Sequence, residues 1–275
     1  MNKFKVALLQ TKVYDDKEKN VENAVKLIES VSKEGADLAV FCEMFCCPYD
    51  NSFFKVYGEK EGGYAYTAMQ KAARDNGIYV VAGTIPELEE DKVYNTSYVF
   101  DRNGKQIAKH RKMHLFDIDI EGGQYFKESD VLTSGKDVTL FDTEFCKIGL
   151  AICYDIRFPE LSRLMATEGA EVIIFPGAFN MTTGPAHWEL SFRARALDNQ
   201  VYTIGVSPAR DLESSYHSYG NSIVVSPWAN VLNRMDEKEG YMIQEIDLGY
   251  VKKIRNELPL LKHIRKDIYL LNKLL

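Results

Sequence analysis

The chain has 275 residues, of which 45% are hydrophobic and 27% charged, as is ordinary for a soluble globular protein. Its net charge of −6 gives no electrostatic support to a nucleic-acid-binding role. No apolar run reaches about 18 residues, so the sequence predicts no membrane span. We therefore expect neither a nucleic-acid nor a membrane partner.

The cysteines argue against a metal or disulfide framework. They are five in number and include no paired C-x-x-C motifs: Cys42, Cys46, Cys47, Cys146 and Cys153. We expect reduced thiols in a cytoplasmic protein, without metal or cofactor. The first ten residues read as a strand rather than a signal peptide.

The first half of the chain alternates strand and helix patterns. Apolar runs predict strands at 4–10, 37–42, 78–85, 93–100 and 106–109, and helical spacing predicts helices at 17–33 and 64–76. The first two strands flank a helix and are expected to be parallel. Residues 44–63 are predicted to be a loop, and the irregular stretch 110–136 is expected to carry function.

The second half has a related pattern. Strands are predicted at 138–141, 145–152, 171–175, 201–207, 222–226, 231–234 and 241–246, and helices at 161–168, 185–199 and 249–257. Strand–helix–strand units at both ends indicate one α/β domain, with two central sheets and helices outside. Residues 258–275 are apolar and basic, with no evident partner in the monomer.

One stretch, residues 147–160, places a cysteine where chemistry can occur. Cys153 ends an apolar strand and faces the start of a helix, and the helix dipole there favours a thiolate. A cysteine nucleophile needs a base, and a buried carboxylate with a raised pKa can serve. Glu43 ends the strand 37–42 and Lys112 lies in the irregular stretch, where an ammonium group would stabilise an oxyanion.

Each of these residues also has an ordinary interpretation. Glu43 can be a helix-capping or surface carboxylate, Lys112 part of a solvated basic run, and Cys153 a small core residue. A Cys–His arrangement through His187 is a weaker alternative. His110 and His114 are four residues apart but lack a helix and the glutamate of a metal motif.

The contexts of these three residues resemble the nitrilase superfamily of carbon–nitrogen hydrolases over essentially the whole chain. They lie in 41–45, 110–116 and 147–160, in the family's order of Glu, Lys and Cys. The resemblance implies a four-layer α-β-β-α sandwich with two mixed sheets flanked by helices. It also implies a single domain over 1–275, whose extension 248–275 lies at the subunit interface of a homodimer or larger assembly.

Three further segments, 114–119, 176–190 and 207–211, resemble the omega-amidase branch of that superfamily. Those enzymes release ammonia from the terminal amide of short dicarboxylic monoamides such as 2-oxoglutaramate and 2-oxosuccinamate. Departures from the family pattern at Cys42, His110 and Asn221 leave the triad intact.

The resemblance implies a role for each residue of the site. Glu43 takes the thiol proton, and Cys153 attacks the amide carbon. Lys112 and the backbone N–H of Tyr154 hold the oxyanion. Water activated by Glu43 then hydrolyses the thioester. Glu128 matches a second family glutamate that orients Lys112 and the substrate; the alternative is an exposed loop carboxylate.

Recognition of a dicarboxylic monoamide requires a positively charged side chain that binds its far carboxylate. Arg157 lies four residues after Cys153 and can bind a carboxylate with two hydrogen bonds. The alternative is a structural ion pair with Asp155 or Glu160. The other expected substrate-binding residues are Tyr49, Thr183, Phe179 and His187.

Two other functions remain open. One is hydrolysis of an N-carbamoyl amide such as N-carbamoyl-β-alanine or N-carbamoylputrescine, which Arg157 and the context of His187 disfavour. The other is a non-catalytic binding protein of the same fold, which has no need to keep all three triad residues. The sequence therefore favours an amidohydrolase whose partners are a small amide and water.

Overall fold

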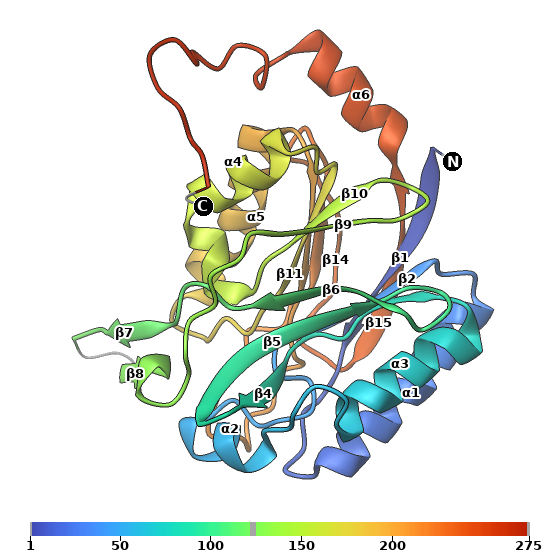
Figure 1. Cartoon of the computed structure of the whole chain (residues 1–275), viewed down its shortest axis with the longest axis vertical. Helices are drawn as coiled ribbons and strands as arrows, with labels where there is room; N and C mark the ends of the chain where they lie inside the picture. Colours follow the sequence, from blue (N-terminus) through green and yellow to red (C-terminus); the bar gives the residue numbers. More distant parts are fainter. Residues whose placement is uncertain (1, 122–124, 274–275) are drawn as a thin grey trace.

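The computed structural model describes residues 2–121 and 125–273 and builds them around two β-sheets (Figure 1). The strands of the first sheet are β1 (Lys3–Gln10), β2 (Leu38–Phe41), β3 (Tyr79–Val81), β4 (Ile85–Glu89), β5 (Lys92–Phe100), β6 (Gln106–Arg111) and β15 (Gly240–Asp247). Their order is β15-β1-β2-β3-β5-β4, and β6 also pairs with β5. Strands β1, β2 and β3 are parallel and the other pairs antiparallel, so the sheet is mixed.

The second sheet, like the first, has parallel strands at its centre. Its order is β14-β13-β12-β11-β10-β9. The strands are β9 (Thr139–Asp142), β10 (Lys147–Leu150), β11 (Val172–Pro176), β12 (Tyr202–Val206), β13 (Ile223–Val225) and β14 (Val231–Arg234). Strands β10, β11 and β12 are parallel. In both sheets, therefore, residues that follow central strands gather at one edge.

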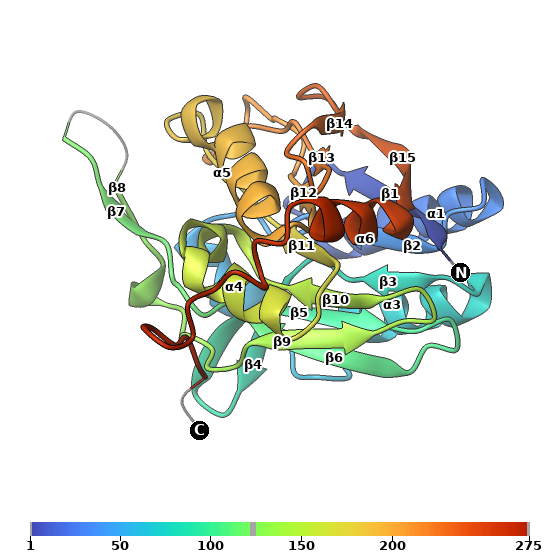
Figure 2. The same cartoon turned by 90° about the horizontal axis from the view of Figure 1, so that it is seen from above.

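Helices cover the outer faces of the two sheets (Figure 2). Helices α1 (Lys17–Lys33) and α3 (Tyr64–Asn76) pack on the first sheet, and α4 (Pro159–Thr167) and α5 (Gly184–Asn199) on the second. Helix α6 (Leu248–Glu257) follows β15. This arrangement confirms the predicted α-β-β-α sandwich. Across the described residues, no helix has the length and apolar character that a bilayer crossing requires.

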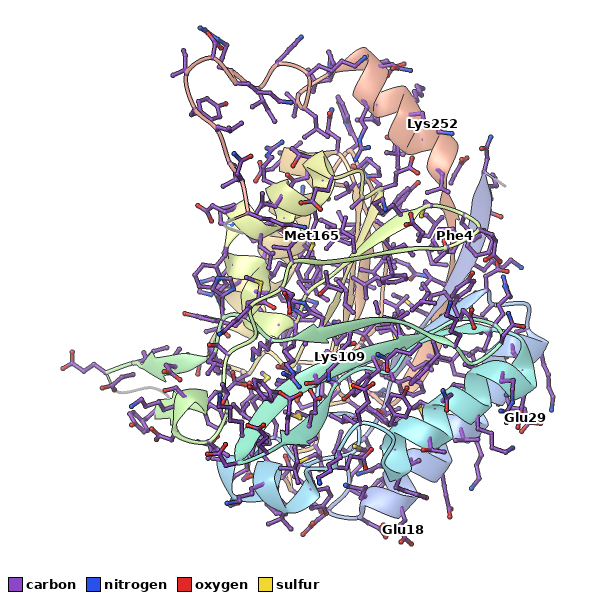
Figure 3. All side chains as sticks on the ribbon, viewed as in Figure 1. Phe4, Glu18, Glu29, Lys109, Met165 and Lys252 are labelled. Atoms are coloured by element: carbon purple, nitrogen blue, oxygen red, sulfur yellow. The ribbon has the colours of Figure 1, made fainter. Side chains whose placement is uncertain are left out.

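Helix α1 shows how sequence spacing produces a layer. Asp16 caps it by accepting a hydrogen bond from the Lys19 backbone N–H. The residues on its inner face recur at helical spacing and are buried: Val21, Ala24, Ile28 and Val31. Glu18 and Glu29 lie on the exposed face and point away from the sheet (Figure 3).

Three predicted boundaries were wrong. The predicted loop 44–63 contains helix α2 (Asn51–Tyr57), capped by Asp50. The predicted strand 78–85 is divided into β3 and β4 at Gly83, whose φ is +43°; a Cβ there would lie 2.1 Å from the Cys42 carbonyl oxygen. The irregular stretch 110–136 contains a short hairpin, β7 (Asp117–Asp119) and β8 (Tyr125–Lys127).

A buried ionic network fixes the strands that lead to Lys112. The Glu87 carboxylate on β4 accepts hydrogen bonds from Arg111 Nε and Nη2, both at 2.8 Å, and from Thr96 Oγ1 at 2.7 Å. The guanidinium of Arg111 lies 3.8 Å from the Tyr94 ring centroid. One carboxylate thus joins β4, β5 and β6, so the register of β6 is set immediately before Lys112.

The charge of Glu87 makes this network sensitive to acid. Burial alone would raise the pKa of Glu87, but hydrogen bonds from Arg111, Lys109 and Thr96 lower it to about 2. In the unfolded chain a glutamate has a pKa of about 4.3. A lowered pKa contributes stability that is present above pH 4.3 and is lost as the pH falls through about 2.

We predict that Glu87→Gln lowers the free energy of unfolding by about 2 kcal/mol at pH 7, because charge-assisted hydrogen bonds are lost. Urea unfolding of both proteins from pH 7 to pH 2 measures this difference. The difference should shrink below about pH 4.3, where the unfolded chain takes up a proton at this residue, and should be lost as the pH falls through about 2. A difference that stays constant down to pH 2 would contradict the network's charge dependence.

Candidate active site

Glu43 leaves the end of β2 on a tightly held turn. The next residue, Met44, has a φ of +52°, and its N–H donates to Thr84 Oγ1 at 2.8 Å. The Thr84 N–H in turn donates to the Cys42 carbonyl at 3.2 Å. The turn therefore aims the Glu43 side chain, which is fully buried, toward the second sheet.

Lys112 comes directly after β6 and is fully buried. Its backbone N–H donates to the Asn95 carbonyl at 2.8 Å, so the strand pairing continues through it. Its ammonium donates to Glu43 Oε1 at 2.9 Å, to Glu128 Oε1 at 2.9 Å and to the Tyr49 hydroxyl at 3.3 Å. Three side chains from two segments, the connection after β2 and the turn at Glu128, thus share one buried cation.

Cys153 begins a short 3-10 helix, Cys153–Arg157, that follows β10. Its φ of +44° is uncommon for a residue with a side chain and marks a strained turn. The Ala178 N–H points at the Cys153 sulfur at 3.5 Å. A Cβ at Gly177 would lie 3.6 Å from the Cys153 Cα, so a glycine after β11 lets that strand end approach the thiol.

Glu128 is buried, contrary to the alternative of an exposed loop carboxylate. Its Oε2 accepts a hydrogen bond from the Phe116 N–H at 2.7 Å, and its Oε1 accepts from Lys112 and from the Tyr49 hydroxyl. The hydroxyl of Tyr49, a residue predicted to bind substrate, therefore contacts both Glu128 and Lys112.

The electrostatics of Glu43 suit a base. Burial raises the pKa of Glu43, the positive charge of Lys112 lowers it, and the negative charge of Glu128 raises it again. Glu43 Oε1 is occupied by Lys112 and by the Asn95 side-chain amide at 2.8 Å. Oε2 is buried without a hydrogen-bond partner among the described residues, so it is the oxygen that remains to accept a proton.

Lys112 stays charged in this setting. Burial lowers the pKa of Lys112, but the carboxylates of Glu128 and Glu43 outweigh burial and raise it above its ordinary value. The ammonium is therefore a fixed positive charge beside Cys153, where it can stabilise a negatively charged oxygen or sulfur.

The expectation that helix geometry alone favours a thiolate at Cys153 was wrong. Burial raises the pKa of the Cys153 thiol well above its ordinary value, and the negative charge of Glu43 raises it further. Lys112 and the Ala178 N–H act in the opposite direction without reversing the shift. The resting residue is a thiol, which makes an adjacent base a chemical requirement.

Arg157 does not form the ion pairs that were the alternative in the sequence. Its Nη1 lies 3.2 Å from His187 Nδ1, and its guanidinium carbon lies 4.9 Å from the Phe179 ring centroid and 5.7 Å from that of Tyr154. Its Nε is buried without a hydrogen-bond partner among the described residues. The guanidinium is therefore held by rings and has hydrogen-bonding capacity left for an anion.

The other predicted substrate residues have varied positions. Phe179 packs against Trp188, with ring centroids 5.1 Å apart, and His187 is exposed on α5 beside Arg157. The Thr183 hydroxyl donates to Asn180 Oδ1 at 3.0 Å, in the turn that precedes α5. Substrate binding by these three residues stays a prediction.

Sequence reasoning missed two members of the site. Asn95 holds Glu43 Oε1 from the middle of β5, and its only sequence signal is that it begins a short polar run, 95–97, inside a predicted strand. The Ala178 N–H, which faces the sulfur, carries no signal because every residue except proline has one. Among the described residues, no group of three metal-ligating side chains lies close enough to hold an ion.

Comparison with known proteins agrees with this geometry. The family described as Carbon-nitrogen hydrolase matches residues 5–256. The chain is 46% identical to omega-amidase NIT2-A of Xenopus laevis and 44% identical to omega-amidase NIT2 of Mus musculus, in each case over 269 residues that cover 98% of both chains. The crystal structure of Saccharomyces cerevisiae Nit3, a member of branch 10 of the nitrilase superfamily, superimposes with a TM-score of 0.89. That comparison has 42% identity and covers 96% of this chain and 97% of Nit3.

Fold, site geometry and these relatives agree on one class, that of hydrolases cleaving carbon–nitrogen bonds. The chain belongs to the carbon–nitrogen hydrolase family, as its resemblance to the nitrilase superfamily implied.

We predict that Glu43→Gln lets Cys153 be alkylated at lower pH, because the variant loses a charge that raises the thiol pKa and keeps Lys112. The midpoint of iodoacetamide alkylation, followed by mass spectrometry, should fall by about 1 pH unit or more. Glu128→Gln is the matched control, since that carboxylate contacts Lys112, Tyr49 and Phe116, and it should shift the midpoint less. A midpoint that rises in Glu43→Gln would contradict the assignment.

Proposed function

We propose that the protein is an omega-amidase, which releases ammonia from the terminal amide of a short dicarboxylic monoamide of the 2-oxoglutaramate or 2-oxosuccinamate type. The observation that carries the proposal is the buried grouping of Cys153, Glu43 and Lys112, with Arg157 in the same turn as the cysteine. Relatives 44–46% identical over nearly the whole chain bear the name omega-amidase.

The proposed reaction begins with proton transfer from the Cys153 thiol to Glu43 Oε2. The thiolate attacks the amide carbon, and the carbonyl oxygen becomes an oxyanion held by Lys112 Nζ and the backbone N–H of Tyr154. Glu43 returns the proton to the amide nitrogen, the carbon–nitrogen bond breaks, and ammonia leaves a thioester on Cys153. Glu43 then takes a proton from water, and the hydroxide attacks the thioester. The departing sulfur takes that proton back, which restores the thiol and frees the acid.

Glu128 and Tyr49 support this reaction by holding Lys112. A buried ammonium between two carboxylates has a fixed position, so it needs little rearrangement when the oxyanion forms. The Tyr49 hydroxyl contacts both Glu128 and Lys112 and adds a third point of attachment. In this proposal Glu128 acts on the substrate through Lys112.

Arg157 supplies the proposed substrate preference. Its guanidinium lies near the rings of Phe179 and Tyr154 and has a buried Nε without a partner among the described residues. A carboxylate can accept two hydrogen bonds from such a group. The far carboxylate of a dicarboxylic monoamide would satisfy it, whereas the amine tail of N-carbamoylputrescine would repel it.

We predict ammonia release from 2-oxoglutaramate and 2-oxosuccinamate at much higher kcat/KM than from glutamine or N-carbamoyl-β-alanine. A coupled ammonia assay measures all four rates, with Cys153→Ala as the control that should lose more than about 10³-fold of activity. Activity that survives Cys153→Ala would end the nucleophile assignment. A carbamoyl substrate that reacts fastest would overturn the omega-amidase proposal.

For Arg157→Lys we predict a KM about tenfold higher for dicarboxylic monoamides, because the ammonium of lysine cannot form the paired hydrogen bonds of a guanidinium. The KM of an amide without a carboxylate should change little, which makes it the internal control. Equal effects on both substrates would remove Arg157 from carboxylate binding.

We further propose a cytoplasmic homodimer whose subunits each form one domain, with residues 248–275 at the interface. All five cysteines are free thiols, as suits a reducing compartment. Beyond α6 the chain arches away from the body and returns near α4 (Figures 1 and 2). A cavity of about 710 Å³ lies between this tail and α4, and the tail exposes Ile268, Tyr269 and Leu270 by 59–68%. A second copy would cover these apolar side chains.

We predict a dimer in analytical ultracentrifugation at micromolar concentration, and its weakening by Leu270→Glu, which places a charge in the proposed interface. Val56→Glu is the matched control, since Val56 on α2 is exposed by 77% and lies outside the tail. A monomeric wild-type protein would contradict the proposal, as would equal effects of the two substitutions.

A further inference from the structure

Asp155 lies two residues after Cys153 and is fully buried. Its carboxylate is surrounded by four nitrogen atoms. Oδ2 accepts from the Ile152 backbone N–H at 2.9 Å and contacts His110 Nε2 at 3.1 Å. Oδ1 accepts from the His114 backbone N–H at 2.9 Å and contacts His114 Nδ1 at 2.7 Å. Neither carboxylate oxygen touches the groups assigned to the chemistry above, so the mechanism leaves Asp155 unexplained.

The partners of Asp155 come from the segment that carries the catalytic cation. His110 and His114 stand two residues before and two residues after Lys112. Each is also held from a second direction, because His110 Nδ1 bonds Thr139 Oγ1 at 2.9 Å and the His114 ring stacks on Phe158 with centroids 3.6 Å apart. One carboxylate therefore joins the turn that begins at Cys153 to both sides of Lys112.

The same carboxylate supports the strained turn at Cys153. A residue with a side chain in a left-handed conformation costs about 1–3 kcal/mol and persists only where its surroundings impose it. Asp155 supports this conformation through two hydrogen bonds to the preceding turn. Its carboxylate accepts from the Ile152 N–H, and its own N–H donates to the Ile152 carbonyl at 2.9 Å. The residue before Cys153 is thus fixed on both of its backbone polar groups.

The charge state of Asp155 fits this arrangement. Burial would raise the pKa of Asp155, but hydrogen bonds from His110 and His114 outweigh it and hold the pKa well below its usual range. An ionised carboxylate only accepts hydrogen bonds, as four converging donors require. An asparagine of the same shape would turn an NH₂ group toward two of those donors and break the set.

We propose that Asp155 is a positioning residue that fixes the Cys153 sulfur relative to the Lys112 ammonium. Proton transfer to Glu43 and oxyanion binding by Lys112 both depend on that relative position, and a misplacement of about 1 Å can cost about 10²-fold in rate. His110 and His114 act with Asp155 as its donors. The test of this inference by kcat rests on the proposed amidase function, because it requires turnover of an amide substrate.

The main test compares Asp155→Asn with Asp37→Asn, which also removes the charge of a hydrogen-bonded carboxylate but lies just before β2, at the opposite end of that strand from Glu43. With 2-oxoglutaramate, Asp155→Asn should lower kcat by about 10²-fold and change KM by less than about threefold. Asp37→Asn should lower stability while the folded protein keeps kcat within about threefold of wild type. An equal loss of kcat in both variants would reduce Asp155 to a general structural role and overturn the proposal.

A second measurement is independent of any substrate. In Asp155→Asn the sulfur should leave the field of Lys112, so the pH midpoint of Cys153 alkylation should rise. If Asp155 acted only through its charge, removing that charge would lower the midpoint, and this outcome would contradict positioning. A wild type that turns over none of the four amides would refute the proposed function and leave this test intact.

His114→Gln provides a second variant in case Asp155→Asn folds poorly. The His114 side chain is exposed by 29%, and its substitution removes one of the four nitrogen contacts of Asp155. We expect a smaller fall in kcat with the same unchanged KM and the same direction of shift in the alkylation midpoint. Wild-type kcat and an unchanged midpoint in His114→Gln would contradict the proposal.

Discussion

The buried ammonium of Lys112 is the interaction on which the rest of the site depends. A lysine removed from water is costly unless carboxylates and hydrogen-bond acceptors surround it. Here Glu43 and Glu128 each lie 2.9 Å from its nitrogen, and all three side chains are fully buried. Because each charge needs the others, removing one partner from such a group typically costs about 3–5 kcal/mol. This mutual dependence fixes the ends of β2 and β6 and the start of the turn at Glu128 relative to one another.

Fixed charges also decide what kind of nucleophile the site contains. Burial raises the pKa of Cys153, and so does Glu43, so the sulfur rests as a thiol beside a carboxylate whose own pKa burial raises. Proton transfer between two such groups is easier than ionisation of either one alone, because it leaves Lys112 facing the new thiolate. In the proposed mechanism the two sheets contribute opposite halves of one reaction. The first sheet supplies the base and the cation, and the second supplies the nucleophile and, in the turn that begins with it, Arg157.

Much of the fold and of the site could be predicted from the sequence because it is expressed in local sequence patterns. Glu43 and Cys153 end apolar strands, and the order of contexts around Glu43, Lys112 and Cys153 is specific enough to indicate the fold and family. Two features could not be predicted in this way. The contact of Tyr49 with Glu128 joins residues 79 positions apart, and the division of β3 from β4 arises from the close approach of Gly83 to the turn before Glu43. Such contacts depend on how distant segments meet, on which hydrophobic periodicity carries no information.

The proposed mechanism requires that Cys153 form a thioester with the acyl part of the substrate. Rapid acid quench of the enzyme with 2-oxoglutaramate, followed by peptide mass spectrometry, tests it most directly. We expect an adduct on the peptide that contains Cys153, with the mass of the substrate less ammonia, which appears before steady-state ammonia release and disappears when substrate is exhausted. Ammonia release without any adduct on Cys153 at the earliest times, or an adduct on one of the other four cysteines, would contradict it.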